Sequence, residues 1–169
     1  MLRALPLALL APFFASGCNL ACDRGGCDAV QHPIDSPQIS AGIAGHIASE
    51  SDEVANGCAE CPLSQVTLSV WSTSMPVTTT ADAQALVDAK GQLLDIMANE
   101  RYEQALDPGN YLACHQGFGP TVCAALTIAS GEVFTVNVQA GYGTSKLVVF
   151  APGSSEPTSE GLFALKPVP

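Results

Sequence analysis

The chain has 169 residues and a formal net charge of −10, with six Lys and Arg residues against sixteen Asp and Glu residues. This acidic balance argues against binding to nucleic acid, which requires phosphate neutralisation, and against electrostatic docking on anionic lipid. Charged residues make up only 13% of the chain, whereas Val, Ala, Thr and Gly are plentiful. Such a composition favours strands and turns over exposed helices.

The first 17 residues have the parts of a secretory signal. Arg3 precedes an apolar run over residues 4–15, and the small pair Ser16-Gly17 ends the segment. The run is shorter than the roughly 20 apolar residues that a membrane-spanning helix needs. Residues 1–17 are therefore expected to be a signal that is removed on export.

The residues around the expected cleavage point, Ala15-Ser16-Gly17-Cys18, resemble the bacterial lipobox. The first lipobox position is usually Leu, and here it is Ala15. The resemblance implies cleavage by signal peptidase II and acylation of Cys18 by palmitate-type chains, with the membrane as the partner of that lipid. Asn19 follows Cys18, which is similar to the pattern of outer-membrane lipoproteins. The alternative is an ordinary signal peptide, which would leave Cys18 as one more thiol.

The cysteine count points to the same residue independently. There are seven cysteines, and an odd number in an exported protein leaves one without a partner in the chain. Acylation of Cys18 leaves six, enough for three disulfides in an oxidising compartment. The candidates are Cys22, Cys27, Cys58, Cys61, Cys114 and Cys123. Cys114–Cys123 is the favoured pair, because a turn-rich stretch would let the two face each other across a hairpin.

The mature chain is long enough for one domain: removal of residues 1–17 leaves 152 of the 169 residues. Residues 18–38 are rich in Cys, Gly and Pro without periodicity, which predicts a flexible tether. Residues 39–152 are expected to form the domain, and residues 153–169 a C-terminal tail.

Alternation predicts most of the strands. Val66, Leu68 and Val70 fall on one side of residues 63–73, and Trp71 falls on the other. Further short strands are expected in Ile39–Ile47 and in residues 101–106, 111–114, 122–128, 132–139 and 146–150, with a last one at 162–165. Six or seven short strands, not counting the last one at 162–165, are separated by Gly and Pro turns, which predicts an all-β fold, a small antiparallel β-sandwich.

The stretch between residues 78 and 106 is ambiguous. Leu86, Ala89, Leu93 and Ile96 follow a helical spacing, which predicts a short helix around residues 82–98. Either Thr80 or Asp82 would cap its start. An irregular excursion is the alternative.

Residues 101–114, with the sequence RYEQALDPGNYLAC, resemble a hairpin of transthyretin-like β-sandwiches, the carboxypeptidase regulatory-domain family of bacterial surface proteins. Pro108 and Gly109 suit a type II turn with a positive φ at the glycine, from which Tyr111 would enter the core. Residues 41–47 resemble the first strand of that family. The resemblance implies a non-catalytic spacer, adhesive or accessory module.

Two alternatives use the Cys58-Ala59-Glu60-Cys61 motif. A redox pair needs its first thiol at a helix N-terminus, but Pro62 and an alternating run follow the motif. A zinc site would join Cys58 and Cys61 to Cys114 and Cys123, with His115 in reserve, although the spacing of the second pair is far from that of a zinc knuckle. A structural disulfide is the favoured interpretation of Cys58 and Cys61.

No catalytic, cofactor or metal site is expected. His32, His46 and His115 lie in different segments without a Ser/His/Asp order, and no Gly-x-Ser-x-Gly motif is present. The sequence therefore predicts a non-enzymatic, lipid-anchored protein of the cell envelope, held at the outer membrane and binding an unknown protein or glycan ligand. The alternative is an exported thiol-redox or zinc protein that uses Cys58 and Cys61.

Overall fold

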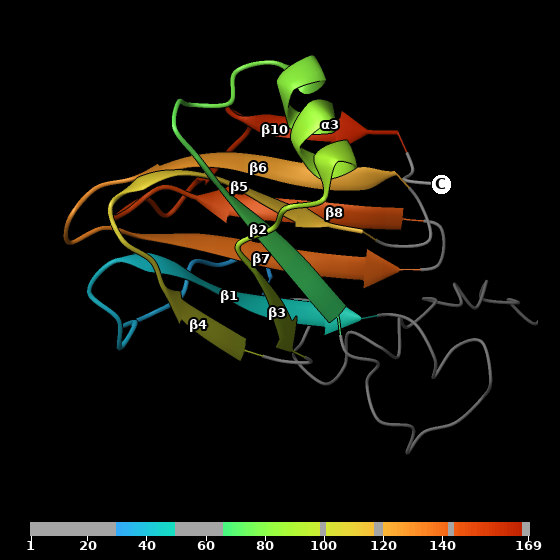
Figure 1. Ribbon diagram of the computed structural model, residues 1–169. Helices are drawn as coiled ribbons and strands as arrows, with labels where there is room; N and C mark the ends of the chain where they lie inside the picture. Colours follow the sequence, from blue (N-terminus) through green and yellow to red (C-terminus); the bar gives the residue numbers. More distant parts are fainter. Residues whose placement is uncertain (1–29, 50–65, 99–100, 117–119, 142–143, 167–169) are drawn as a thin grey trace, which may run out of the picture.

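The computed structural model describes residues 30–49, 66–98, 101–116, 120–141 and 144–166, which form two five-stranded sheets and one helix (Figure 1). The elements are β1 Gly42–Ser49, β2 Val66–Thr73, α3 Thr80–Ala89, β3 Leu94–Ala98, β4 Arg101–Ala105, β5 Gly109–His115, β6 Thr121–Ile128, β7 Val133–Gly141, β8 Thr144–Phe150, β9 Pro157–Thr158 and β10 Leu162–Leu165. The predicted all-β sandwich is confirmed, with more strands than the six or seven expected.

The strands divide between two sheets. Sheet A has the order β4-β1-β7-β8-β9, and sheet B has the order β10-β6-β5-β2-β3. All pairs are antiparallel except β1 and β7, which run parallel with Gly42 beside Val133. The consecutive strands β5 and β6 form a hairpin, as do β7 and β8.

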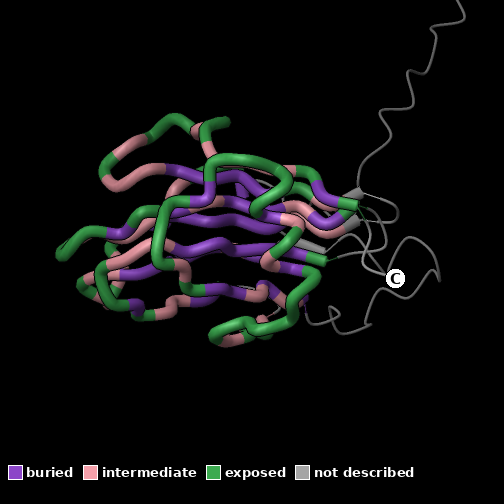
Figure 2. The backbone as a smooth tube through the Cα atoms, turned by 45° about the horizontal axis from the view of Figure 1, so that its top comes forward, coloured by how far each residue is buried: buried purple, intermediate pink, exposed green. Residues whose placement is uncertain are grey.

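The inner faces of both sheets form the main core. In Figure 2 the buried residues, in purple, lie mostly along the strands. On β2 the inward side chains are Val66, Leu68 and Val70, as their alternation predicted. Tyr102 reaches across from β4, and its hydroxyl donates a hydrogen bond to the Val136 carbonyl oxygen at 2.5 Å. Gly45 on β1 lies against both of these residues, where a side chain would have no space.

Helix α3 covers the outer face of sheet B. Thr79 caps it, because its hydroxyl accepts a hydrogen bond from the Asp82 amide at 3.1 Å. Ala83 and Val87 are the buried helix residues, and they pack in one cluster with Trp71. The second face of β2, where the alternation placed Trp71, is therefore buried as well.

The prediction of a helix around residues 82–98 was right in kind but wrong in extent and in its cap. The helix ends at Ala89, after which Lys90 has a φ of 48°. Leu93 lies beyond the helix and is 54% exposed, and Ile96 belongs to the strand β3. The apparent helical stripe thus combined one helix with the strand that follows it.

The segment around Pro108 is a corner between the sheets, so the predicted hairpin was wrong. β4 pairs with β1 in sheet A, whereas β5 pairs with β2 and β6 in sheet B. Gly109 begins β5 and is not among the glycines with positive φ, which also corrects the predicted turn type. Tyr111 does enter the core, and its hydroxyl donates a hydrogen bond to the Asp107 carbonyl oxygen at 2.7 Å.

The folded body extends past both expected boundaries, residues 39 and 152. Val30 and Ile34 are buried, so the described part of the expected tether is packed on the domain. At the other end, β9 pairs with β8 and β10 pairs with β6. The last strand is where the sequence predicted it, and it brings the expected tail into sheet B. The signal and Cys18 lie outside the described residues.

Candidate functional site

Cys114 and Cys123 form a disulfide, as their spacing predicted. They are directly opposite each other in the β5–β6 register, with Cα atoms 4.0 Å apart. Both are buried on the outer face of sheet B, in the cluster under α3 that includes Trp71. Because both sulfurs are used here, the four-thiolate zinc site considered above lacks two of its ligands. Cys58 and Cys61 lie outside the described residues, so their pairing stays a prediction.

Removal of this disulfide is expected to cost roughly 2–3 kcal/mol, because it constrains the unfolded chain over a short loop. The Cys114→Ala, Cys123→Ala double variant should therefore unfold at a lower urea concentration than the wild type. Thr127→Ala on β6 is the control: it removes one exposed hydrogen bond to Asn110 and should cost about 1 kcal/mol or less. A double variant as stable as this control would contradict a stabilising role for the disulfide.

A strap, defined as residues 30–40, lies on the outer face of sheet A. Asn137 holds it from the middle of β7: its Nδ2 donates to the carbonyl oxygens of Val30 at 3.0 Å and His32 at 2.8 Å. The Asn137 Oδ1 accepts a hydrogen bond from the His46 amide at 2.8 Å, and the side chain has no exposed surface. The strap is thus joined to both β1 and β7 through one buried amide.

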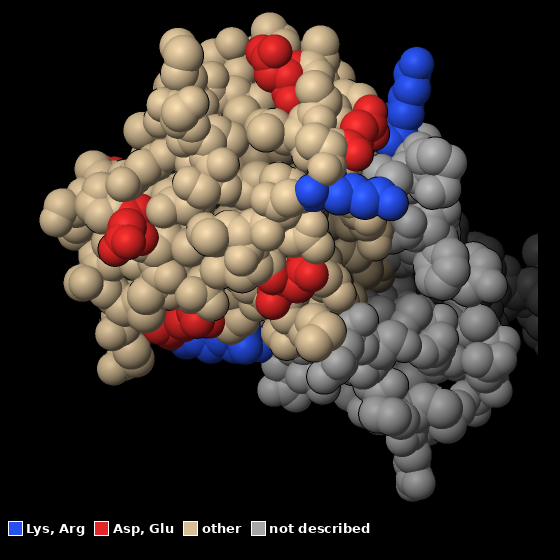
Figure 3. Space-filling view, in the orientation of Figure 1, with Lys and Arg blue, Asp and Glu red and all other residues tan. Residues whose placement is uncertain are grey.

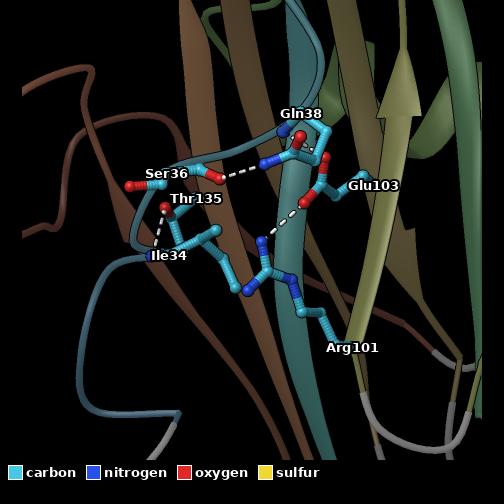
Figure 4. A network of polar contacts seen from close by, with 6 residues as sticks. All are labelled: Ile34, Ser36, Gln38, Arg101, Glu103 and Thr135. Carbon is cyan, nitrogen blue, oxygen red and sulfur yellow. Dashed lines mark hydrogen bonds and ion pairs between the residues drawn. The ribbon is translucent and has the colours of Figure 1, made fainter.

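Further contacts fix the second half of the strap (Figure 4). The Ile34 amide donates to the Thr135 hydroxyl at 3.0 Å, and the Gln38 amide donates to the Glu103 carboxylate at 2.7 Å. Glu103 also accepts a hydrogen bond from Arg101 at 2.6 Å. The Arg101 guanidinium first, and the Gln38 amide next, hold the pKa of the Glu103 carboxyl below its usual value.

Two adjoining hollows lie at the end of the sandwich that we call the Gly131 end, where β6 turns into β7. The first, of about 610 Å³, is lined by Leu93, Leu106 and Pro108 among others. The second, of about 730 Å³, lies between the strap and the 151–155 loop. Ser40 and Gly131 line both.

The hollows are lined mainly by apolar side chains, proline rings and hydroxyl groups. The hydroxyl groups include those of Thr135 and several serines, and Asp107 is the one carboxylate among the lining residues that the structure describes. On the face of the molecule shown in Figure 3, acidic and basic side chains are few and scattered.

His115 is a buried ionisable residue at the end of β5, on the opposite end of the sandwich, which we call the His115 end. Its side chain is inside the sandwich, and its Nδ1 lies 3.0 Å from the Thr67 carbonyl oxygen. Among the described residues, neither its Nε2 nor the Ser145 hydroxyl has a hydrogen-bond partner. Burial lowers the pKa of His115, although the Thr67 carbonyl acts in the opposite direction.

Stability is therefore expected to fall in mild acid. Because burial disfavours the charged imidazole of His115 in the folded protein, the unfolded chain takes up a proton at this residue first as the pH falls through the ordinary pKa of 6.5. The free energy of unfolding should decrease as the pH falls through 6.5 toward the lowered pKa. Urea unfolding between pH 8 and pH 5 measures this change, and His115→Gln should flatten it. The pH dependence of the His46→Gln variant is the comparison, because the pKa of His46 is also lowered, by burial and by Arg101.

If the His115→Gln variant keeps the full pH dependence of the wild type, His115 is not its source.

The three histidines do not converge. His32 lies in the strap, His46 on β1 and His115 on β5. Within the described ranges no group of three or more His, Cys, Asp or Glu side chains is placed to hold a metal ion. No helix in that part of the chain is long and apolar enough to cross a membrane.

Sequence reasoning missed the strap and Asn137. A usable signal was the asparagine itself, which interrupts the valines of a strand although this residue type is depleted in strands.

The comparisons with known proteins found no relative: no protein-family model, curated protein or solved structure shows a significant match to this chain. The described residues form a disulfide-linked β-sandwich with a strap on sheet A.

Proposed function

We propose that this protein is an exported, non-enzymatic β-sandwich, anchored by a lipid on Cys18 and acting as a binding, adhesive or structural module of the cell envelope. Cysteine pairing carries the proposal. The Cys114–Cys123 disulfide fits an oxidising compartment and uses two of the seven cysteines. The remaining five are an odd number, so at least one has no partner within the chain, and the lipobox resemblance points to Cys18.

Two further observations support the binding role. The hollows at the Gly131 end offer apolar surface and hydroxyl groups. A two-sheet sandwich is the architecture that the transthyretin-like, carboxypeptidase regulatory-like resemblance implied, although residues 101–114, which carried that resemblance, form a corner between the sheets and not a hairpin. In that family the domain would be a non-catalytic module. The ligand of such a module would be a protein or a glycan of the envelope, and the outer membrane would be its site.

Cys18→Ser tests the anchor. In the producing bacterium the wild type should partition into the detergent phase of membrane extracts, whereas Cys18→Ser should move to the aqueous phase, because an acyl chain contributes about 0.8 kcal/mol per buried CH₂ group. The control is Ser16→Ala, which keeps a small residue before the cysteine and should partition as the wild type does. A Cys18→Ser variant that has lost residues 1–17 and still stays in the detergent phase would disprove acylation as the anchor.

A further inference from the structure

The segment of residues 74–93, which we call the α3 segment, covers the Cys114–Cys123 disulfide. Both cysteines lie on the outer face of sheet B, yet their exposed fractions are only 0% and 1%. They belong to the cluster around Trp71, against which the helix lies beside β10 (Figure 1). The buried members of this cluster that lie outside sheet B are all in the α3 segment: Val77, Ala83 and Val87.

The α3 segment is held to the domain by few groups. Besides its three buried side chains it has long exposed stretches, residues 74–76, 78–82 and 88–93. The Lys166 amide, just after β10, donates a hydrogen bond to the Gln84 side chain at 3.0 Å. Because the backbone hydrogen bonds of a helix are internal, removal of α3 breaks no ladder of sheet B. A ten-residue helix is also too short to be stable away from the sheet.

The strands that carry the disulfide are held much more firmly. β5 and β6 lie inside sheet B, and each is paired along both edges. Their inner faces are part of the main core. Separation of these strands therefore requires loss of the ladders and of the core, whereas loss of α3 requires neither. Elements with few buried contacts open at a lower free energy than the whole domain unfolds.

We infer that the α3 segment is a lid over a redox-sensitive bond: it leaves sheet B while both sheets stay folded, and a thiol then reaches the Cys114–Cys123 disulfide. The thiolate of the reductant attacks one cysteine sulfur, which forms a mixed disulfide and releases the other cysteine as a thiolate. A second thiol of the reductant displaces the remaining cysteine. Two thiols of the reductant are thereby oxidised to a disulfide, and Cys114 and Cys123 receive the two electrons and become thiols. Neither the proposed anchor nor a ligand is needed for this step.

The rate at which dithiothreitol reduces this disulfide without denaturant tests the lid. Val87→Ala in α3 and Val66→Ala in the main core remove the same atoms from buried sites, which are 2% and 6% exposed. Both changes should lower the urea midpoint, but only Val87→Ala should raise the population of the open lid. The full mature protein would be alkylated at intervals. Peptide mass spectrometry would then follow Cys114 and Cys123 separately from the other cysteines.

We expect Val87→Ala to be reduced about fivefold or more faster than the wild type, and Val66→Ala to be reduced at the wild-type rate. Ala85→Gly, at an exposed position of α3, should also accelerate reduction severalfold, because glycine weakens the helix without changing its packing. Circular dichroism confirms that each variant is folded.

Equal acceleration in Val87→Ala and Val66→Ala would overturn the lid, since reduction would then require unfolding of the whole domain. Wild-type rates in both Val87→Ala and Ala85→Gly would overturn it as well, because access to the disulfide would then not depend on α3.

Discussion

Gly45→Ala is expected to destabilise the protein by about 3 kcal/mol or more, a large part of the stability of a single domain. A Cβ atom at this position would overlap the Val136 carbonyl oxygen and lie 2.8 Å from the Cε1 atom of Tyr102. The first neighbour is backbone of the central strand β7, and the second is a buried ring whose hydroxyl bonds to the same carbonyl. Neither group has room to move aside, so urea should unfold the variant much earlier.

The chain offers a matched control in Gly91, between α3 and β3. A Cβ atom there would meet nothing within 4 Å, and the backbone is not in the left-handed region. Gly91→Ala should leave the urea midpoint unchanged or raise it slightly, since alanine restricts the unfolded chain. Equal effects of Gly45→Ala and Gly91→Ala would contradict the close packing of β1 against Tyr102.

Asn137→Ala is the second substitution with a large expected effect. It removes hydrogen bonds to the buried Val30 carbonyl and to the partly buried backbone groups of His32 and His46. We expect a loss of roughly 2–4 kcal/mol in the free energy of unfolding. The strap should also loosen before the rest of the domain, so its backbone amides should exchange with solvent faster than those of β5.

Asn110→Ala serves as the control for this substitution. Asn110 is only partly buried on β5, and its side chain accepts one exposed hydrogen bond from Thr127. The loss should be about 1 kcal/mol or less, with no change in exchange within the strap. If Asn137→Ala behaves like Asn110→Ala, the strap does not depend on the buried amide.

Alternation in the sequence was enough to predict the sandwich. Strands such as β2 bury one face in the core, so Val66, Leu68 and Val70 repeat at every second residue. The Cys114–Cys123 pair could also be predicted, because a hairpin brings two cysteines on neighbouring strands into register. Both features depend on local chain geometry, which the sequence encodes directly.

The features that could not be predicted depend on contacts between distant segments. Trp71 is buried because α3 and β10 cover the outer face of sheet B, and no local pattern near Trp71 indicates this. The strap has the composition of a linker, with Pro33 and Pro37, and it is ordered by Asn137, about a hundred residues later in the chain. The corner at Pro108 resembles a hairpin locally, although its two strands enter different sheets.

The most direct test of export, acylation and disulfide pairing is the intact mass of the protein extracted from its native membranes, measured before and after reduction. We predict a chain that begins at Cys18 and has an added acyl mass, with a gain of two hydrogens on reduction for each of three disulfides formed by the other six cysteines. An unmodified Cys18 in a chain whose mass does not change on reduction would contradict all three.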